Sequence, residues 1–97
     1  MVSLDDSIKK HRPLAAREVA GEVVIMTGAD AKLHTLNEVG TFVWGLLDSE
    51  TRVARIVSAV VENFKVDREA AERDVLKFLD DMIEKDILVA GRQQDDD

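Results

Sequence analysis

The sequence predicts an α+β domain in which a three-stranded antiparallel meander is followed by three helices. Up to Leu36 the apolar residues fall in short β-branched runs separated by glycine-containing turns, which is typical of strands. After Leu36 the apolar spacing changes to three and four residues, the repeat of an amphipathic helix. The length of 97 residues allows one domain with a modest core.

The meander is expected in the first half of the chain. Residues 17–20 form a short candidate strand, and Gly21-Glu22 supplies a tight turn. The run at 23–26 is apolar and β-branched, which favours a strand with both faces partly covered. A second turn at 28–30 leads into a third strand at 31–36.

The three helices are each expected to begin at a capping residue. Asn37, Thr51 and Asp67 precede them, and side chains of these types accept hydrogen bonds from the free amides of a first turn. The third helix is expected to run to about Lys85, before a short terminal strand at 88–89.

A glycine inside the first predicted helix also needs a reason. Gly40 costs a helix about 1 kcal/mol relative to alanine, so another backbone is expected to approach it. A strand of the meander that passes over the helix would account for the glycine.

The domain boundaries follow from composition. Residues 1–12 are polar and mixed in charge, so a flexible segment is expected there, apart from Leu4 and Ile8, which could dock. The folded domain is expected at 13–90, from the single proline onward, and 91–97 is read as an acidic disordered tail.

Composition excludes several kinds of chemistry. The chain has no cysteine, no phosphate-binding glycine loop and no metal-binding motif, and its two histidines lie in different regions. We therefore expect neither an enzyme nor a cofactor or metal ion. No apolar run approaches the roughly 20 residues that span a bilayer, so a soluble, cytoplasmic protein is expected.

The net charge of the chain limits the kinds of partner that it can bind. Three strands with three helices, the short second turning into the longer third, suggest a winged helix-turn-helix type of domain. However, Asp and Glu number 20 against 13 Lys and Arg, a formal net charge of -7 that disfavours nucleic acid and anionic membranes. A winged-helix DNA-binding regulator and a structural dimer subunit remain as alternatives.

The third helix is apolar over about half of its circumference, wider than a surface helix needs. One edge of this arc holds Phe78 and Met82, and the other holds Leu76 and Ile83. Either the helix is wedged between two others, or one edge faces a groove for a partner.

A family resemblance covers most of the chain. The stretch KLHTLNEVGTFVWGLLDSETRVARIVSAV, residues 32–60, is similar to the helical half of the coenzyme PQQ synthesis protein D (PqqD) family. The shared pattern is Leu-Asn, a glycine three residues later, an aliphatic-Trp pair, Leu-Leu-Asp and a helix with Val-x-x-Ile. Residues 17–26 resemble the first hairpin of the family, and 64–82 its third helix. Ser49 and Asp86 depart from it, because the family usually has glycine there.

The resemblance implies a RiPP recognition element, a non-catalytic peptide chaperone. Such a module binds the leader of a ribosomally made precursor peptide and presents it to a modifying enzyme, often a radical-SAM enzyme, in PQQ or related biosynthesis. The leader is implied to add as a strand beside the third strand and to pack against the third helix. The predicted peptide-binding residues are Lys32, Leu33, His34 and Thr35 on the strand and Val75, Phe78 and Met82 on the helix.

Two further expectations concern partners. The helix edge near Phe78 also carries Asp74, Asp81 and Lys85, and the net charge of -7 favours a cationic or mixed-charge leader. A free strand edge also allows a homodimer as an alternative use of the same surface.

Overall fold

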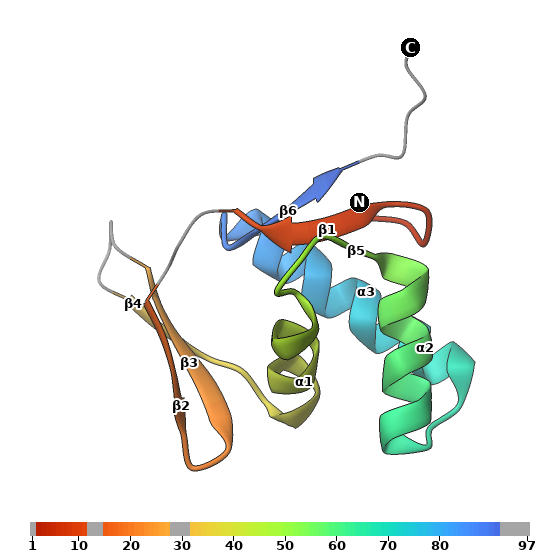
Figure 1. The fold of residues 1–97 in the computed structure, drawn as a ribbon, viewed down its shortest axis with the longest axis horizontal. Helices are drawn as coiled ribbons and strands as arrows, with labels where there is room; N and C mark the ends of the chain where they lie inside the picture. Colours follow the sequence, from red (N-terminus) through yellow and green to blue (C-terminus); the bar gives the residue numbers. More distant parts are fainter. Residues whose placement is uncertain (1, 12–14, 28–31, 92–97) are drawn as a thin grey trace.

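Two three-stranded antiparallel sheets and three helices make up the computed structural model, which describes residues 2–11, 15–27 and 32–91 (Figure 1). The predicted α+β class is confirmed, with a meander followed by three helices. The second sheet was not predicted, and it involves the N-terminal segment.

The meander consists of β2 (Ala15–Val19), β3 (Glu22–Thr27) and β4 (Lys32–Thr35), paired in that order. Ala20 and Gly21 join β2 to β3, and both have positive φ, 53° and 85°. A two-residue turn of this kind matches the twist of the paired strands, and glycine takes the second position without steric cost. The turn therefore begins one residue earlier than expected. The predicted turn at 28–30 lies outside the described residues.

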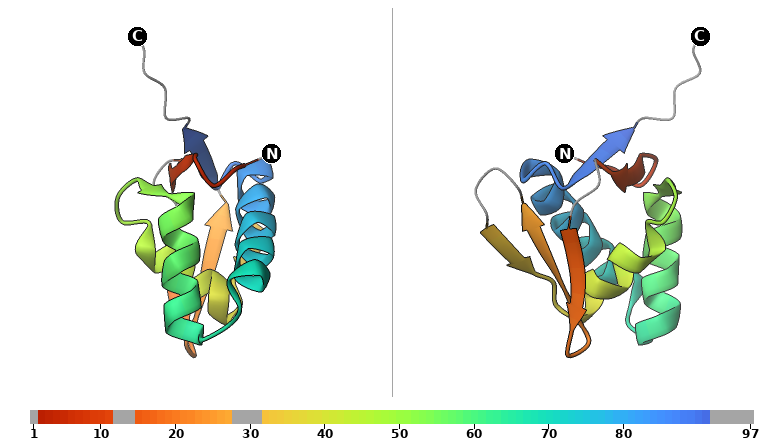
Figure 2. Two further views of the ribbon diagram at one scale, coloured as in Figure 1. Left: turned by 90° about the vertical axis from the view of Figure 1, so that its right-hand side faces the viewer. Right: turned by 60° about the vertical axis from the view of Figure 1, so that its left-hand side comes forward.

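Helix α1 (Glu38–Leu46) covers the inner face of the meander and packs against β3. Val23 and Ile25 point toward it and are buried. The views in Figures 1 and 2 show α1 between the meander and the other two helices. The meander therefore has one face in the core and one face turned outward.

The junction between β4 and α1 is closely hydrogen-bonded. Asn37 caps α1 as predicted, because its side-chain oxygen accepts from the Gly40 amide at 2.8 Å. The Thr41 hydroxyl accepts from the Val23 amide at 2.9 Å and donates to the Leu36 carbonyl at 3.3 Å. Leu36 itself donates to the Val23 carbonyl at 2.8 Å. These bonds fix the orientation of α1 against the sheet.

Helices α2 (Val53–Phe64) and α3 (Arg68–Glu84) pack against each other, and α3 leads into β6 (Leu88–Gly91). Their apolar faces supply a large share of the core. No helix in the described part of the chain is long and apolar enough to cross a bilayer. The fully buried side chains from these elements include Val53, Ile56, Val57, Val75, Leu79 and Leu88, together with Ile87 in the connection between α3 and β6.

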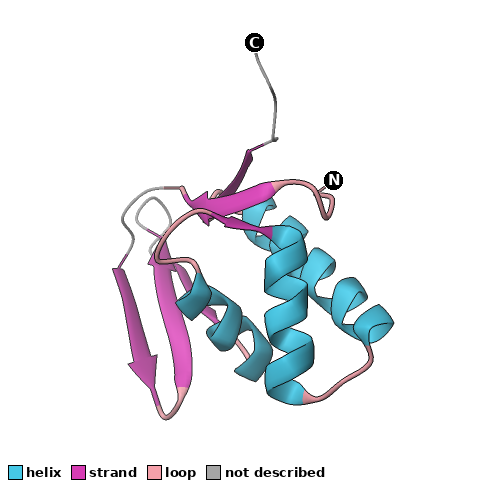
Figure 3. Cartoon of the chain, turned by 45° about the vertical axis from the view of Figure 1, so that its right-hand side comes forward, coloured by secondary structure: helices cyan, strands magenta, loops and turns pink. Residues whose placement is uncertain are grey.

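The N-terminal segment differs from the expectation of a flexible stretch at 1–12. Strand β1 (Ser7–Lys10) pairs with β6 and with the two-residue β5 (Thr51–Arg52), and the resulting sheet lies across one end of α2 and α3 (Figure 3). Ile8 is fully buried and joins the core, as its apolar character allowed. The partners of β1 lie more than forty residues away, so a local reading of composition does not reveal them.

The start of α2 also differs from the prediction. Thr51 is a strand residue, and its hydroxyl donates to the Ser49 carbonyl at 2.9 Å instead of capping the helix. The first amides of α2 are satisfied by backbone carbonyls of the N-terminal segment, with Val53 donating to Asp6 at 2.8 Å and Ala54 to Leu4 at 3.2 Å. Asp67 occupies the N-cap position of α3 as expected, without a side-chain capping bond.

Truncation of Ile8 tests the role of β1. We expect Ile8→Ala to lower the free energy of unfolding by about 2–5 kcal/mol, because a fully buried isoleucine side chain is lost from the core. Urea unfolding followed by circular dichroism measures the change. Lys9→Ala, at the neighbouring exposed position, is the control and should stay within about 0.5 kcal/mol of the parent. Equal stability of the two variants would contradict a structural role for β1.

Candidate functional site

A groove runs between the free edge of β4 and helix α3, and it contains two hollows. The larger, of about 650 Å³, lies between the start of α1 and α3. The smaller, of about 310 Å³, lies between β4 and the last turns of α3. Asn37, Phe78 and Asp81 line both, so the two hollows adjoin at these three residues.

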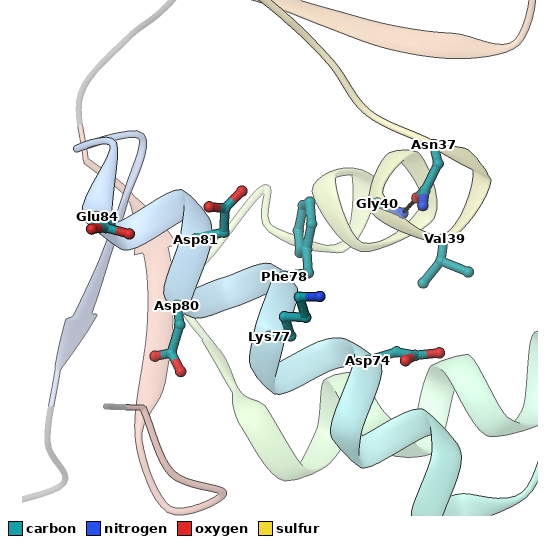
Figure 4. A pocket seen from close by; sticks show the side chains of 9 residues that line it. All are labelled: Asn37, Val39, Gly40, Asp74, Lys77, Phe78, Asp80, Asp81 and Glu84. Carbon is teal, nitrogen blue, oxygen red and sulfur yellow. Dashed lines mark hydrogen bonds between the residues drawn. The ribbon is translucent and has the colours of Figure 1, made fainter.

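Phe78 and Gly40 meet at the centre of this groove. A Cβ atom at Gly40 would lie 2.9 Å from Cε1 of Phe78 and 3.3 Å from the Asn37 side-chain oxygen. In Figure 4 the Phe78 ring points from α3 toward the first turn of α1. The expectation that a backbone strand approaches Gly40 is therefore corrected: the neighbour is an aromatic side chain from α3. Phe78 is only partly buried, so one part of its ring packs on α1 while the rest lines the groove.

The free edge of β4 offers backbone groups along the groove. In an antiparallel ladder, residues alternate between facing the neighbouring strand and facing away from it. The amide of Leu36 donates to the carbonyl of Val23 on β3, so by alternation the backbone groups of His34 also face β3. The amides and carbonyls of Leu33 and Thr35 therefore point to the free edge. An extended chain placed there would find donors and acceptors at two residues of β4.

The charges of the groove are mainly acidic. Asp74, Asp80, Asp81 and Glu84 line the larger hollow together with one cation, Lys77. Lys85 lines the smaller hollow and forms an ion pair with Asp81 at 2.8 Å. Asp80 accepts the backbone amide of Val2 at 2.9 Å. Four carboxylates against two ammonium groups leave this face of α3 with a formal charge of about -2, which favours a cationic ligand.

The structure brings most of the predicted site residues to this groove. His34, Thr35, Phe78 and Met82 line the smaller hollow. Lys32 belongs to β4, but its side chain lies outside what the structure describes.

Two predicted residues point elsewhere. Val75 is fully buried in the core and lines neither hollow, so its side chain offers no surface to a ligand. The side chain of Leu33 is 63% exposed and lies on the outer face of the meander, away from the groove.

The prediction missed several residues that line the larger hollow: Asn37, Val39, Gly40, Lys77, Asp80 and Glu84. On α3 a sequence signal was present, because positions 74, 77, 78, 81, 84 and 85 repeat every three or four residues and form one polar stripe around Phe78. At the start of α1, the only feature of the sequence that pointed to a close neighbour was the loss of helix stability that Gly40 causes.

The chemistry that this groove supports is binding. Among the residues that the structure describes, no group of three or more histidine and acidic side chains is placed to hold a metal ion. What the groove offers is an open strand edge, an aromatic surface and a charged helix face. These features suit an extended, partly apolar chain segment.

Comparison with known proteins agrees with this description. Fold and groove define a small α+β domain whose open strand edge faces a helix. The chain belongs to the coenzyme PQQ synthesis protein D (PqqD) family, whose model matches residues 22–88, more than half of the sequence. Among solved structures, one described as TbiB1 in complex with the TbiA(beta) leader peptide is similar, with 28% identity and a TM-score of 0.74 over 91% of this chain and 99% of the other. A search of curated proteins found no match.

Gly40→Ala tests the contact at the centre of the groove. The added methyl group would lie 2.9 Å from the Phe78 ring, so the ring must move and the packing is strained. We expect the free energy of unfolding to fall by about 1 kcal/mol, because an overpacking cost of about 1–3 kcal/mol exceeds a gain in helix propensity of about 1 kcal/mol. Thermal and urea denaturation measure this change.

Gly45→Ala is the matched control on the same helix. A Cβ atom there meets nothing within 4 Å, so the variant should be stabilised by up to about 1 kcal/mol. If Gly40→Ala raises stability as Gly45→Ala does, Phe78 does not require a glycine at position 40.

Proposed function

We propose that this protein is a non-catalytic peptide-recognition module that binds the leader segment of a ribosomally made precursor peptide. The leader adds as a strand to the free edge of β4 and packs against Phe78 on α3. The observation that carries the proposal is the pairing of an open strand edge with an aromatic-lined groove directly beside it. Backbone bonds then hold a peptide of many sequences, while the groove selects among side chains.

Family membership and the structural relative support this proposal. The relative, TbiB1, was solved with a leader peptide, and its fold is similar to that of this chain over nearly its whole length. By this similarity, we further propose that the bound leader is presented to a separate modifying enzyme, such as a radical-SAM enzyme. This would place the protein in PQQ or related peptide biosynthesis in the cytoplasm.

The alternative of a winged-helix DNA-binding regulator gains no support from the site. DNA affinity depends largely on neutralising phosphates with lysine and arginine. The groove face of α3 instead carries Asp74, Asp81 and Glu84 beside its two lysines. A peptide with basic residues is the better electrostatic complement.

The function is tested by titrating the isotope-labelled protein with synthetic leader segments of the short precursor peptide encoded nearest its gene. Saturable NMR shifts confined to β4, the start of α1 and the Phe78 side of α3 are the expected result. Shifts confined to other surfaces would contradict the groove. A folded protein that binds no segment of the peptide, and instead binds duplex DNA at moderate salt, would favour the regulator.

Phe78→Ala tests the aromatic wall of the groove. An aromatic anchor at the centre of an interface typically accounts for about 2 kcal/mol or more, so we expect leader affinity to fall by at least about 30-fold. Because Phe78 is only partly buried, the loss of folding stability should stay below the roughly 3–5 kcal/mol typical of a buried phenylalanine. Fluorescence anisotropy and urea unfolding measure the two effects.

Leu76→Ala provides the control for Phe78→Ala. Leu76 is also partly buried on α3 but lines neither hollow, so its truncation should lower stability and leave peptide affinity within about twofold. Equal loss of affinity in both variants would mean that the effect of Phe78→Ala is general destabilisation of α3.

Asp74→Asn tests the acidic character of the groove. Exposed charge pairs contribute about 0.2–1 kcal/mol, so we expect affinity for a lysine-containing leader segment to fall about two- to fivefold at low salt. The difference should vanish at high salt because exposed charges are screened. Glu69→Gln, an exposed change in the first turn of α3 outside the groove, should have no effect. An effect of Asp74→Asn that is independent of salt would contradict an electrostatic role.

A further inference from the structure

The outer face of the meander carries several exposed apolar side chains beside Arg17, Glu22 and Thr35, although a sheet face turned to solvent usually carries mainly polar residues. Four large hydrophobic side chains are well exposed among the described residues, and three of them lie on this face: Val19 at 54%, Met26 at 46% and Leu33 at 63%. The fourth, Val66 at 41%, lies between α2 and α3. The exposed apolar surface is therefore concentrated on the meander. A hollow of about 530 Å³ on this face is lined by Ala15, Ala16, Arg17, Val19, Val24, Met26 and Leu33.

The strand register arranges part of this surface as a row. Ala15 on β2 lies opposite Met26 on β3, and Met26 lies opposite Leu33 on β4. Directly opposed residues of an antiparallel sheet point to the same face, so the three side chains form one line across the meander. We call Ala15, Met26 and Leu33 the outer row. The row ends at the free edge of β4 with Leu33, which is 63% exposed against 46% for Met26.

The outer row ends where the proposed peptide strand begins. Leu33 directs its backbone groups to the free edge, so a strand that pairs there places one of its residues directly beside Leu33. That residue shares the outer face, while the residues before and after it point inward toward the groove. The side chain beside Leu33 therefore becomes the next member of the outer row.

We propose that the bound peptide is recognised on both faces, with Leu33 as a specificity-determining residue for an apolar side chain that points away from the groove. The substrate class is then an extended segment with an apolar residue beside Leu33, flanked on the inward side by residues that enter the acidic, aromatic groove. This inference rests on the proposed function and adds a second selecting surface to it. Apolar cross-strand neighbours stabilise a sheet, and the pairing would cover Leu33 at the free end of the row.

A second copy of the chain is a poorer occupant for this face. The face spans only three strands of four to six residues, a projected area of about 240 Å², so it offers little surface to a second copy. Each copy also carries a net charge of -7, so two copies repel each other. A peptide strand, in contrast, continues the row through backbone pairing.

Selection from a displayed library of random peptides about twelve residues long tests the proposal with no leader sequence specified in advance. The purified protein is the bait, in parallel with its variants Leu33→Lys and Val66→Lys. We expect the parent and Val66→Lys to enrich the same motif, with an apolar residue at one position. Leu33→Lys should replace that residue by aspartate or glutamate and leave the other positions unchanged. For a synthetic peptide of the parent motif, affinity for Leu33→Lys should fall about two- to fivefold and recover on the apolar-to-glutamate change.

Each other outcome has a distinct meaning. If the parent enriches no peptide, the proposed function fails and this inference fails with it. If enrichment depends on Phe78 but all three selections give the same motif, the proposed peptide binding is supported. The proposal that Leu33 selects a side chain is then overturned. If sedimentation shows a dimer that Leu33→Lys converts to a monomer, the face belongs to a second copy and the proposal is overturned. Leu33 is 63% exposed, so its replacement should not impair folding, which circular dichroism checks.

Discussion

The hydroxyl group of Thr41 fixes how the meander is held against the helices, and the groove depends on it. The hydroxyl accepts a hydrogen bond from the amide of Val23 and donates one to the carbonyl of Leu36. Both of these backbone groups lie at the end of the β3–β4 pairing. Backbone groups in such a place need a partner, and here the partner comes from the next element of the chain. The first turn of α1 therefore completes the end of the sheet through Thr41 and also holds the helix cap, in which Asn37 accepts from the Gly40 amide. With α1 held in this way, Gly40 admits the Phe78 ring, and Phe78 borders the hollow that β4 lines.

An open strand edge invites pairing with unintended partners, so a protein that keeps one needs other means of control. In this chain β4 is only four residues long, which limits the hydrogen bonds available to a chance partner. The facing helix carries the acidic residues of the groove, and the whole chain has a net charge of -7. Like-charged copies repel each other, so the same charges that favour a basic peptide also disfavour self-association. The edge thus stays available for binding.

The features that the sequence predicted are those encoded by neighbouring residues. The change of period at Leu36, the cap at Asn37 and the run at 23–26 each involve a few adjacent positions, and the structure contains all of them. The strand β1 was not predicted because its partners lie at the other end of the chain, and the same segment supplies the carbonyls that begin α2. In the site, Val75 and Phe78 were both predicted to line the groove that the family resemblance implies. Only the arrangement of α1 and α2 decides that Val75 is buried while Phe78 borders the groove.

In the proposed complex, the energetics of strand addition would make side chains on both sides of β4 matter. Leu33 and Thr35 offer four backbone groups at the free edge, and each hydrogen bond contributes a net of about 0.5–1.5 kcal/mol, or about 2–6 kcal/mol in all. Association costs an estimated 4–15 kcal/mol in lost motion, and an extended peptide loses further conformational freedom. Backbone pairing on so short an edge therefore does not hold a peptide by itself. The remaining free energy has to come from apolar contacts, which this fold offers at Phe78 inside the groove and at Leu33 outside it. Because both contacts are made by side chains of the peptide, the sequence of the ligand decides whether it stays bound.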